Sequence, residues 1–212
     1  MALENEEGSG NAIGSHWERL SVYDELMTGT EMGTQKSFTA LTFAILKDMG
    51  WYYVDSTFPD ETNYGKDLGC DFYNDACYGS TQYSKYFCES ADFTNVTECS
   101  TTFLGKAGCY DEPSLMADGC GMFLDYWSCA DPDTADYGYE KWSLEDYAVD
   151  SFCVKGTLAT IGITSSYRGR CYKHTCDTAN NKIVFTVGEY TITCFEIDAG
   201  IKKTVSGLFQ SM

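Results

Sequence analysis

The chain has 212 residues, of which 43% are hydrophobic and 15% aromatic, which is enough apolar material for a packed core and argues against a disordered tail. Asp and Glu number 32 against 14 Lys and Arg, and the net charge of −18 argues against nucleic acid or anionic lipid as a partner. No stretch approaches the roughly 20 apolar residues of a membrane span, and the acidic start, Leu3-Glu4-Asn5-Glu6-Glu7, is unlike a secretory leader.

The first clear hydrophobic periodicity in the chain lies between Ser37 and Gly50. Apolar residues recur there at helical spacing and share one face: Phe38, Leu41, Ala44, Ile45 and Met49. Ser37 is suited to be the N-cap and Gly50 the C-terminal stop. The sequence therefore predicts a helix here that buries its apolar face.

Residues 64–129 are rich in cysteine, glycine and tyrosine and follow neither the helical nor the strand period, which predicts a loop-rich region. The whole chain holds 11 cysteines, at positions 70, 77, 88, 99, 109, 120, 129, 153, 171, 176 and 194. Structural zinc knuckles need closely paired cysteines with histidines, but the shortest gap separates Cys171 from Cys176 and only 2 histidines exist. A framework of at least four disulfides is the better interpretation.

Disulfides indicate an extracellular or cell-surface protein, and Asn95-Val96-Thr97 is a sequon that predicts glycosylation of Asn95. Because the chain has no leader of its own, we expect it to belong to a longer precursor whose start is missing. The odd number of cysteines also predicts one that stays unpaired.

The last third of the chain differs in charge and in pattern. Residues 1–150 carry 7 basic and 28 acidic side chains, whereas residues 151–212 carry 7 and 4, so we expect a boundary near Asp150. Strands are predicted over residues 157–164, 182–187 and 190–193, and Gly188-Glu189 separates the last two as a hairpin turn.

Few residues could carry chemistry, since nucleophile elbows, phosphate loops and H-E-x-x-H are all absent from the sequence. His174 lies between Cys171 and Cys176 and is expected to be a strand or loop residue between disulfide cysteines, because cystine sulfur does not bind metal. An acidic cluster could suggest calcium but lacks the ordered calcium-loop pattern, and a solvated turn is expected instead: Asp131, Asp133 and Asp136. His16 stands in a loop beside Trp17, and on pattern alone it would be structural.

Several motifs nevertheless keep one order and approximate spacing over about 70 residues and resemble the leishmanolysin family of metzincin zinc peptidases. They are Gly14-Ser15-His16-Trp17-Glu18, Asp24-Glu25-Leu26-Met27, the helix over 37–48, Gly50-Trp51-Tyr52 and Gly69-Cys70-Asp71-Phe72. A looser likeness, Arg168-Gly169-Arg170-Cys171-Tyr172, is similar to the C-terminal domain of that family.

The resemblance implies that two zinc-binding histidines and the general-base glutamate come from an H-E-x-x-H helix, and that a third histidine precedes a methionine-containing turn beneath the metal. His16 matches the third ligand and Met27 the turn methionine. The helix face of Phe38 would then pack behind this turn. Because the sequence contains no H-E-x-x-H, it supplies no catalytic residue by itself. The resemblance also makes Cys194 the candidate unpaired cysteine.

The resulting prediction is an α+β chain, the C-terminal part of a metzincin catalytic domain followed by a disulfide-rich, β-rich region. Residues 1–65 would end the catalytic domain, 66–149 form a cysteine-rich acidic region and 150–212 a β-rich domain. The function implied is a fragment of a zinc metalloendopeptidase that hydrolyses internal bonds of protein or peptide substrates with one zinc ion, inactive as the isolated chain. Two alternatives stay open: a non-catalytic extracellular adhesion or binding module, and a secreted cystine-rich domain whose likeness is coincidental.

Overall fold

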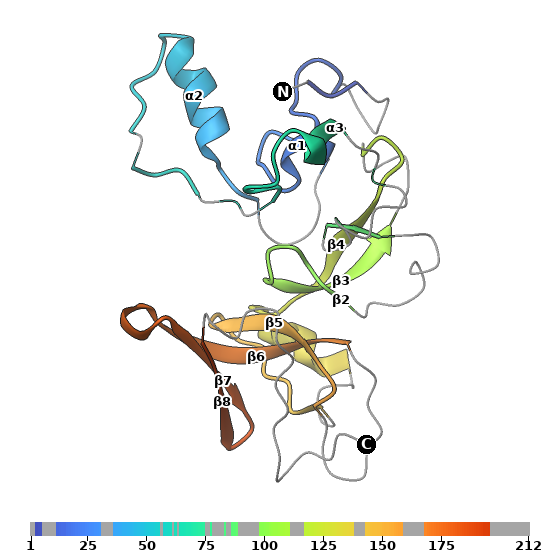
Figure 1. Ribbon diagram of the computed structural model, residues 1–212, viewed down its shortest axis with the longest axis vertical. Helices are drawn as coiled ribbons and strands as arrows, with labels where there is room; N and C mark the ends of the chain where they lie inside the picture. The colour runs from blue at the N-terminus through green and yellow to red at the C-terminus, as the bar shows by residue number, and fades with distance from the viewer. Residues whose placement is uncertain are drawn as a thin grey trace. The chain divides into compact units, whose positions relative to one another are not determined.

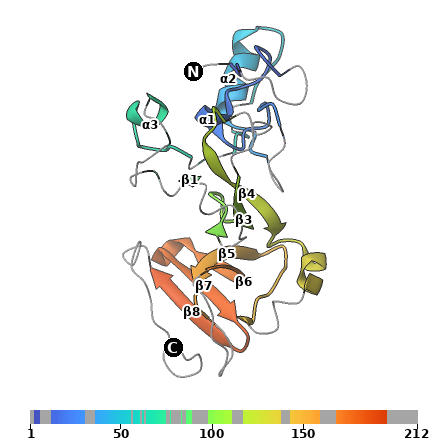
Figure 2. The same ribbon diagram turned by 90° about the vertical axis from the view of Figure 1, so that its right-hand side faces the viewer.

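The computed structural model shows a β-rich chain with few helices, divided into two compact units (Figures 1 and 2). Unit 1 comprises residues 1–95 and 109–124, and unit 2 comprises residues 96–108 and 125–212. The structure describes residues 3–5, 12–30, 36–55, 57–60, 62, 64–74, 77, 83, 86–88, 98–110, 117–137, 143–158 and 168–195. These units are defined by contacts within the structure and do not test the three domains that the sequence predicts, so that division stays a prediction.

Unit 1 holds the α-helices α1 (Arg19–Val22), α2 (Ala40–Asp48) and α3 (Asp71–Asn74). The predicted helix is α2, but the predicted N-cap is wrong, because Thr39 caps it by accepting from the Leu41 amide at 3.3 Å. Ser37 is held in an extended bridge beside Glu25, where its amide donates to Asp24 O at 2.8 Å.

The apolar face of α2 is not buried as predicted. Ile45 and Met49 are 38% and 43% exposed, and Thr42 is the buried residue of the helix. The hydroxyl of Thr42 hydrogen-bonds inside the unit, so a polar contact rather than an apolar stripe attaches α2.

The core of unit 1 is aromatic and centres on Tyr64. Its ring stacks on Tyr23 with centroids 5.1 Å apart and meets the edges of Phe72 and Tyr86 at 5.1 and 5.2 Å. Such pairs favour offset or edge-on geometry because ring faces are negative and ring edges positive. The core also includes Cys120, which forms a disulfide with Cys77. Aromatic rings therefore take the place that aliphatic side chains occupy in most protein cores.

The first sheet contains β1 (Phe87–Cys88), β2 (Glu98–Cys99), β3 (Gly105–Tyr110) and β4 (Gly121–Ser128) in the order β1-β4-β3-β2. The prediction that residues 64–129 are loop-rich is wrong for these strands. Along β3 five of six residues are buried, so its two faces do not alternate between apolar and polar. Gly121 permits the close pairing of β1 with β4, because a Cβ there would lie 2.3 Å from Cys88 O.

The second sheet, visible as one layer of strands in Figure 2, contains β5 (Ser151–Gly156), β6 (Arg168–Asp177), β7 (Lys182–Val187) and β8 (Tyr190–Phe195). Its strands are antiparallel in the order β5-β6-β7-β8. The predicted hairpin is confirmed, since Val187 pairs with Tyr190 and Gly188 takes a φ of 58° in the two-residue turn. Of the predicted strand over 157–164, residues 157 and 158 follow β5 outside any strand and the others lie outside the described residues.

The described residues of unit 2 also form the short 3-10 helices η4 (Pro132–Tyr137) and η5 (Thr178–Asn180). Asp131 accepts from the Asp133 amide at 2.9 Å, so this predicted acidic turn carries a side-chain cap at the start of η4.

All eleven cysteines lie in the described residues, and four disulfides form as the sequence predicts: Cys77–Cys120, Cys88–Cys109, Cys99–Cys153 and Cys129–Cys171. Cys194 is free as expected, but the prediction of a single unpaired cysteine is wrong, because Cys70 and Cys176 are free as well. None of the helices in the described ranges has the length and apolar character needed to cross a membrane.

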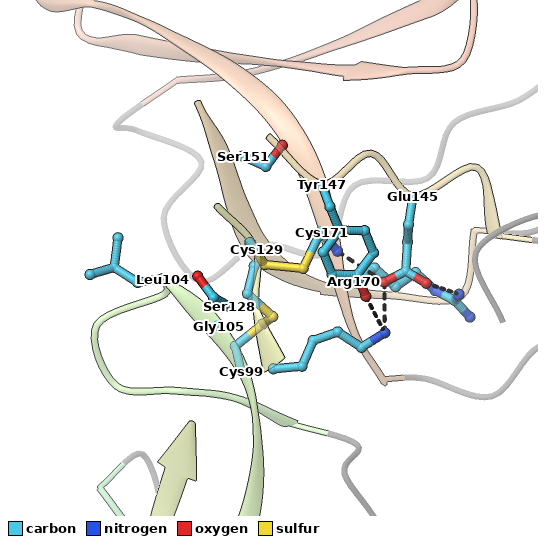
Figure 3. Close-up of a disulfide and its surroundings, with 12 residues drawn as sticks. Cys99, Leu104, Gly105, Ser128, Cys129, Glu145, Tyr147, Ser151, Arg170 and Cys171 are labelled. Carbon is cyan, nitrogen blue, oxygen red and sulfur yellow. Dashed lines mark hydrogen bonds and ion pairs between the residues drawn. A yellow bond between two sulfur atoms is a disulfide. The ribbon is translucent and has the colours of Figure 1, made fainter. Parts of the chain in front are cut away.

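A buried charged cluster lies beside two of these disulfides in unit 2 (Figure 3). The Glu145 carboxylate accepts from Lys106 Nζ at 2.9 Å and from the Cys171 amide at 3.0 Å. Lys106 Nζ also lies 3.0 Å from the Tyr147 hydroxyl, and Arg170 Nη1 lies 4.0 Å from Glu145. We call Lys106, Glu145, Tyr147 and Arg170 the Glu145 cluster. Burial lowers the pKa of Arg170, although the negative charge of Glu145 partly opposes this shift.

Candidate functional site

His16 follows a tight turn whose carbonyl groups orient its ring. Its Nδ1 atom lies 3.2 Å from Ala12 O and 2.9 Å from Ser15 Oγ, and the His16 amide donates to the same Ala12 carbonyl at 3.2 Å. When Nδ1 carries the proton and donates to Ala12 O, the lone pair stands on Nε2. Within the described part of the chain, no hydrogen-bond partner meets Nε2. Metal-binding histidines are oriented in this way, by a carbonyl on the nitrogen that does not bind the metal.

The main chain of His16 lies beside that of Met27. The next residue, Trp17, donates its amide hydrogen to Met27 O at 2.8 Å and forms a parallel β-bridge with Thr28. On the other side, the Glu4 amide donates to His16 O at 2.9 Å. The structure thus brings the predicted metal ligand and the predicted turn methionine together at the level of the backbone. The Met27 side chain is 40% exposed, and its position beneath a metal stays a prediction.

A buried carboxylate holds the turn that contains Met27. Glu25 is fully buried, and its Oε2 accepts from the Met27 amide at 2.6 Å. Its Oε1 accepts from the Thr42 hydroxyl of α2 at 2.5 Å, with the Thr39 hydroxyl at 3.4 Å. The turn is therefore attached to α2 through one side chain.

A buried guanidinium holds the chain that follows the turn. Arg19 is fully buried and donates to Thr28 Oγ1 at 3.3 Å, to Thr30 Oγ1 at 2.6 Å and to the Thr30 carbonyl. Burial lowers the pKa of Arg19 to about 10, while the phenol of Tyr23 and the carboxylates of Glu4 and Glu18 oppose the shift. Arg19 therefore stays charged at neutral pH and fixes residues 28–30.

A cavity of about 520 Å³ lies nearby in unit 1, between the end of α1, the start of α2 and a following segment that includes Thr57, Asp60 and Tyr64. Thr39, which contacts Glu25, belongs to its wall, but neither His16 nor Met27 lines it. The cavity is thus next to the candidate site and separate from it.

The residues described here do not make a zinc site by themselves. They contain no group of three His, Cys, Asp or Glu side chains that could hold a metal ion, and the full sequence lacks H-E-x-x-H. A catalytic zinc ion needs three protein ligands and one open position, so one imidazole is too few.

The other candidates predicted from the sequence lie elsewhere. His174 is on β6, stacks on Phe152 with centroids 3.8 Å apart and has Nδ1 2.6 Å from Asp150 O. Its predicted setting between two disulfide cysteines is wrong in part, because Cys171 is paired and Cys176 is free. Asn95 lies outside the described residues.

Sequence reasoning missed Glu25, Thr42 and Arg19. Their residue types are usually exposed, and only their burial in the folded chain gives them a role. The one signal in the sequence was the position of Glu25 two residues before the turn methionine.

Comparison with known proteins gives one family. The sequence model of the family Peptidase_M8, described as leishmanolysin, matches residues 1–197. Leishmanolysin of Leishmania major is 28% identical over 206 residues, which cover 84% of this chain and 33% of that protein. The leishmanolysin homolog of Crithidia fasciculata is 27% identical over 242 residues, covering 100% of this chain and 36% of that protein.

A further relative is the ciliated left-right organizer metallopeptidase of Danio rerio, 27% identical over 213 residues that cover 97% of this chain and 32% of that protein. The chain therefore spans about a third of the length of the curated relatives it matches. No solved structure matches it.

Proposed function

Since this chain belongs to the leishmanolysin family of peptidases, we propose that it is the C-terminal portion of a zinc metalloendopeptidase that cleaves internal bonds of proteins. In this proposal His16 contributes one ligand to a metal site that polypeptide outside these 212 residues completes. The 212 residues would end the metzincin catalytic domain and add a disulfide-rich β region.

The orientation of the His16 ring carries the proposal. Its Nδ1 lies against the Ala12 carbonyl, which leaves Nε2 as the ligand atom, and its backbone lies beside the turn that contains Met27. A histidine that only filled a loop would need neither feature. The carbonyl on Nδ1 is usual for a metal-binding histidine, and the neighbouring turn is what the family resemblance implies for a third ligand.

The isolated chain is expected to be inactive. It lacks two metal ligands and the general base of the family, and His16 alone cannot hold a zinc ion in a defined geometry. The four disulfides support an extracellular or cell-surface location, where thiols are oxidised.

The test is a longer polypeptide that joins the genomic sequence upstream of Met1 to this chain, compared with variants of the two histidines. We expect the longer protein to bind one zinc ion and to cleave casein in a chelator-sensitive manner. His16→Ala should lower zinc affinity at least 100-fold, whereas the matched control His174→Ala should leave it within twofold. Full zinc binding by His16→Ala would overturn the assignment of this ligand.

The absence of H-E-x-x-H from the sequence favours one second candidate, a non-catalytic extracellular binding or adhesion module that kept the disulfide scaffold. The same experiment separates the two. An upstream sequence without an in-frame H-E-x-x-H, together with a zinc-free longer protein, would establish the binding module and overturn the peptidase proposal.

A further inference from the structure

Four residues around the candidate site form a closed circuit of hydrogen bonds. The Met27 amide donates to Glu25 Oε2 at 2.6 Å, and the Met27 carbonyl accepts from the Trp17 amide at 2.8 Å. The Trp17 indole Nε1 donates to Thr42 Oγ1 at 3.0 Å, and the Thr42 hydroxyl donates to Glu25 Oε1 at 2.5 Å. We call Trp17, Glu25, Met27 and Thr42 the Glu25 circuit.

The circuit joins three segments that the chain order separates. Thr42 lies 17 residues from Glu25 and 25 from Trp17, and it is the buried residue of α2. Trp17 directly follows His16, and its amide belongs to the peptide bond between the two residues. The circuit therefore includes a group that is bonded directly to the candidate ligand. The apolar face of α2 is largely exposed, with Ile45 and Met49 open to solvent, and Thr42 is the residue of the helix that joins the circuit.

We propose that Glu25 is a positioning residue, which holds the His16 segment and the Met27 turn in one fixed arrangement against α2. This inference rests on the proposed function for its meaning in catalysis. The structural part of the proposal is that Glu25 sets the geometry of Met27 and His16. This part can be tested on the metal-free chain.

Both oxygens of the side chain are needed, and this requirement makes the proposal testable. One oxygen accepts from the Met27 amide while the other accepts from Thr42. A glutamine has one oxygen and one NH₂ group, and the NH₂ group cannot accept a hydrogen bond. One of the two donors would therefore face another donor and lose its hydrogen bond. An aspartate is one methylene shorter and could not reach both.

Glu25 also differs from Glu145 in the partners that surround its carboxylate. Glu145 lies against the cations Lys106 and Arg170, whereas the acceptor capacity of Glu25 is met by neutral donors from the turn and from residues 39 and 42. Buried carboxylates are retained when such hydrogen bonds compensate their desolvation. Replacing Glu25 should therefore disturb these particular contacts and leave unit 2 intact.

The experiment uses the full 212-residue chain, oxidised and metal-free, in the forms Glu25→Gln, Thr42→Val and Thr42→Ser. Two signals are measured by NMR: hydrogen exchange of the Met27 amide, and the ¹⁵N shifts of the His16 ring, which report its tautomer. A purely structural contribution would lower the unfolding temperature without selectively changing either signal. Asp60→Ala is the matched control, because Asp60 accepts from the Phe38 amide at 2.8 Å before α2 and does not contact the circuit.

We expect Glu25→Gln to raise the exchange rate of the Met27 amide at least tenfold and to turn the His16 ring from one tautomer into a mixture. Thr42→Val should raise that rate at least threefold, Thr42→Ser should restore it to within twofold, and Asp60→Ala should leave it within twofold. If Glu25→Gln does not fold, the Thr42 pair decides the question.

An unchanged Met27 exchange rate and His16 tautomer in Glu25→Gln, or in Thr42→Val where the first variant is unfolded, would overturn the proposal. Equal effects of Thr42→Val and Asp60→Ala would do the same, because they would show general loosening of α2. The metal-ligand role of His16 is judged separately by zinc binding of His16→Ala, so either idea can fail alone.

Discussion

Two buried glutamates organise the two units of this protein in different ways. Glu25 in unit 1 accepts hydrogen bonds from neutral amides and hydroxyls, and residues 12–49 around it contain no cysteine. Glu145 in unit 2 meets the cations Lys106 and Arg170 beside the Cys99–Cys153 and Cys129–Cys171 disulfides. The Met27 turn is thus held by neutral donors to a buried carboxylate in a segment without disulfides, whereas Glu145 lies among cations beside two disulfides.

Removing the charge of Glu145 is expected to have the largest effect on stability. Glu145→Gln would leave Lys106 and Arg170 buried without their anion, and breaking a buried pair costs about 3 to 5 kcal/mol. Chemical denaturation measures this loss, with Lys106→Met/Glu145→Gln as the control that removes one cation as well. A double variant as unstable as Glu145→Gln alone would contradict an electrostatic cause.

Removing the Cys129–Cys171 disulfide should have the next largest effect and should be confined to unit 2. The bridge closes a loop of 42 residues, and replacing both cysteines by alanine should cost about 2 to 4 kcal/mol through the added entropy of the unfolded chain. Hydrogen exchange should accelerate in β5 and β6 and stay unchanged at Met27. Cys176→Ala is the control, because this cysteine is free and exposed and its loss should be nearly neutral.

Thr42→Val should destabilise unit 1 by about 1 to 3 kcal/mol, since Glu25 Oε1 loses its shortest hydrogen bond and the Trp17 indole loses its acceptor. Denaturation followed by tryptophan fluorescence measures the change, with Thr42→Ser as the variant that keeps the hydroxyl. A loss of the same size in Thr42→Ser would mean that packing of the methyl group, rather than the hydroxyl, stabilises the contact.

The comparison also explains how far the sequence predicts the fold. The β7–β8 hairpin is predicted because its signals are local: alternating side chains and a glycine at the turn. Strands β3 and β4 are missed because β3 is buried on both faces and because β4 begins with Gly121, which allows close approach to Cys88. Hydrophobic periodicity cannot reveal a strand that has no solvent-exposed face.

The N-cap of α2 shows the same limit on a smaller scale. Ser37 and Thr39 are both good caps by residue type, and the choice depends on Asp24, whose carboxylate and carbonyl bind Ser37 from 13 residues away. Capping propensities depend on residue type and near neighbours, so they cannot predict the effect of Asp24 on Ser37.

The candidate site also contains residues that could be predicted from the sequence and residues that could not. His16 and Met27 could be named only through the family resemblance, because one histidine and one methionine in a polar stretch carry no signal of their own. The Glu25 circuit could not be named at all, since it depends on hydrogen bonds across 17 and 25 residues. What the sequence does supply is the short spacing from Glu25 to Met27, which allows the carboxylate to reach back to the turn.

The smallest expected effect is a pH dependence that two aspartates of unit 1 contribute with opposite sign. Burial raises the pKa of Asp24, although the Ser37 hydroxyl opposes the shift by donating to its carboxylate at 2.9 Å. A pKa raised in the folded state adds stability below the unfolded value of about 3.9, and this stability is lost as pH rises through the folded pKa. The stability of the wild type relative to Asp24→Asn should therefore fall between about pH 3 and neutrality.

Asp55 provides the matched contrast, because hydrogen bonds from the hydroxyl and amide of Thr57 lower its pKa. A lowered pKa adds stability above the unfolded value that is lost as pH falls through the folded pKa, so wild type relative to Asp55→Asn should gain stability over the same rise in pH. Denaturant titrations of the three proteins from about pH 3 to about pH 7 measure both slopes. Equal slopes would show that solvent reaches Asp24 as freely as Asp55, and would contradict the buried setting of the segment that leads into the Glu25 circuit.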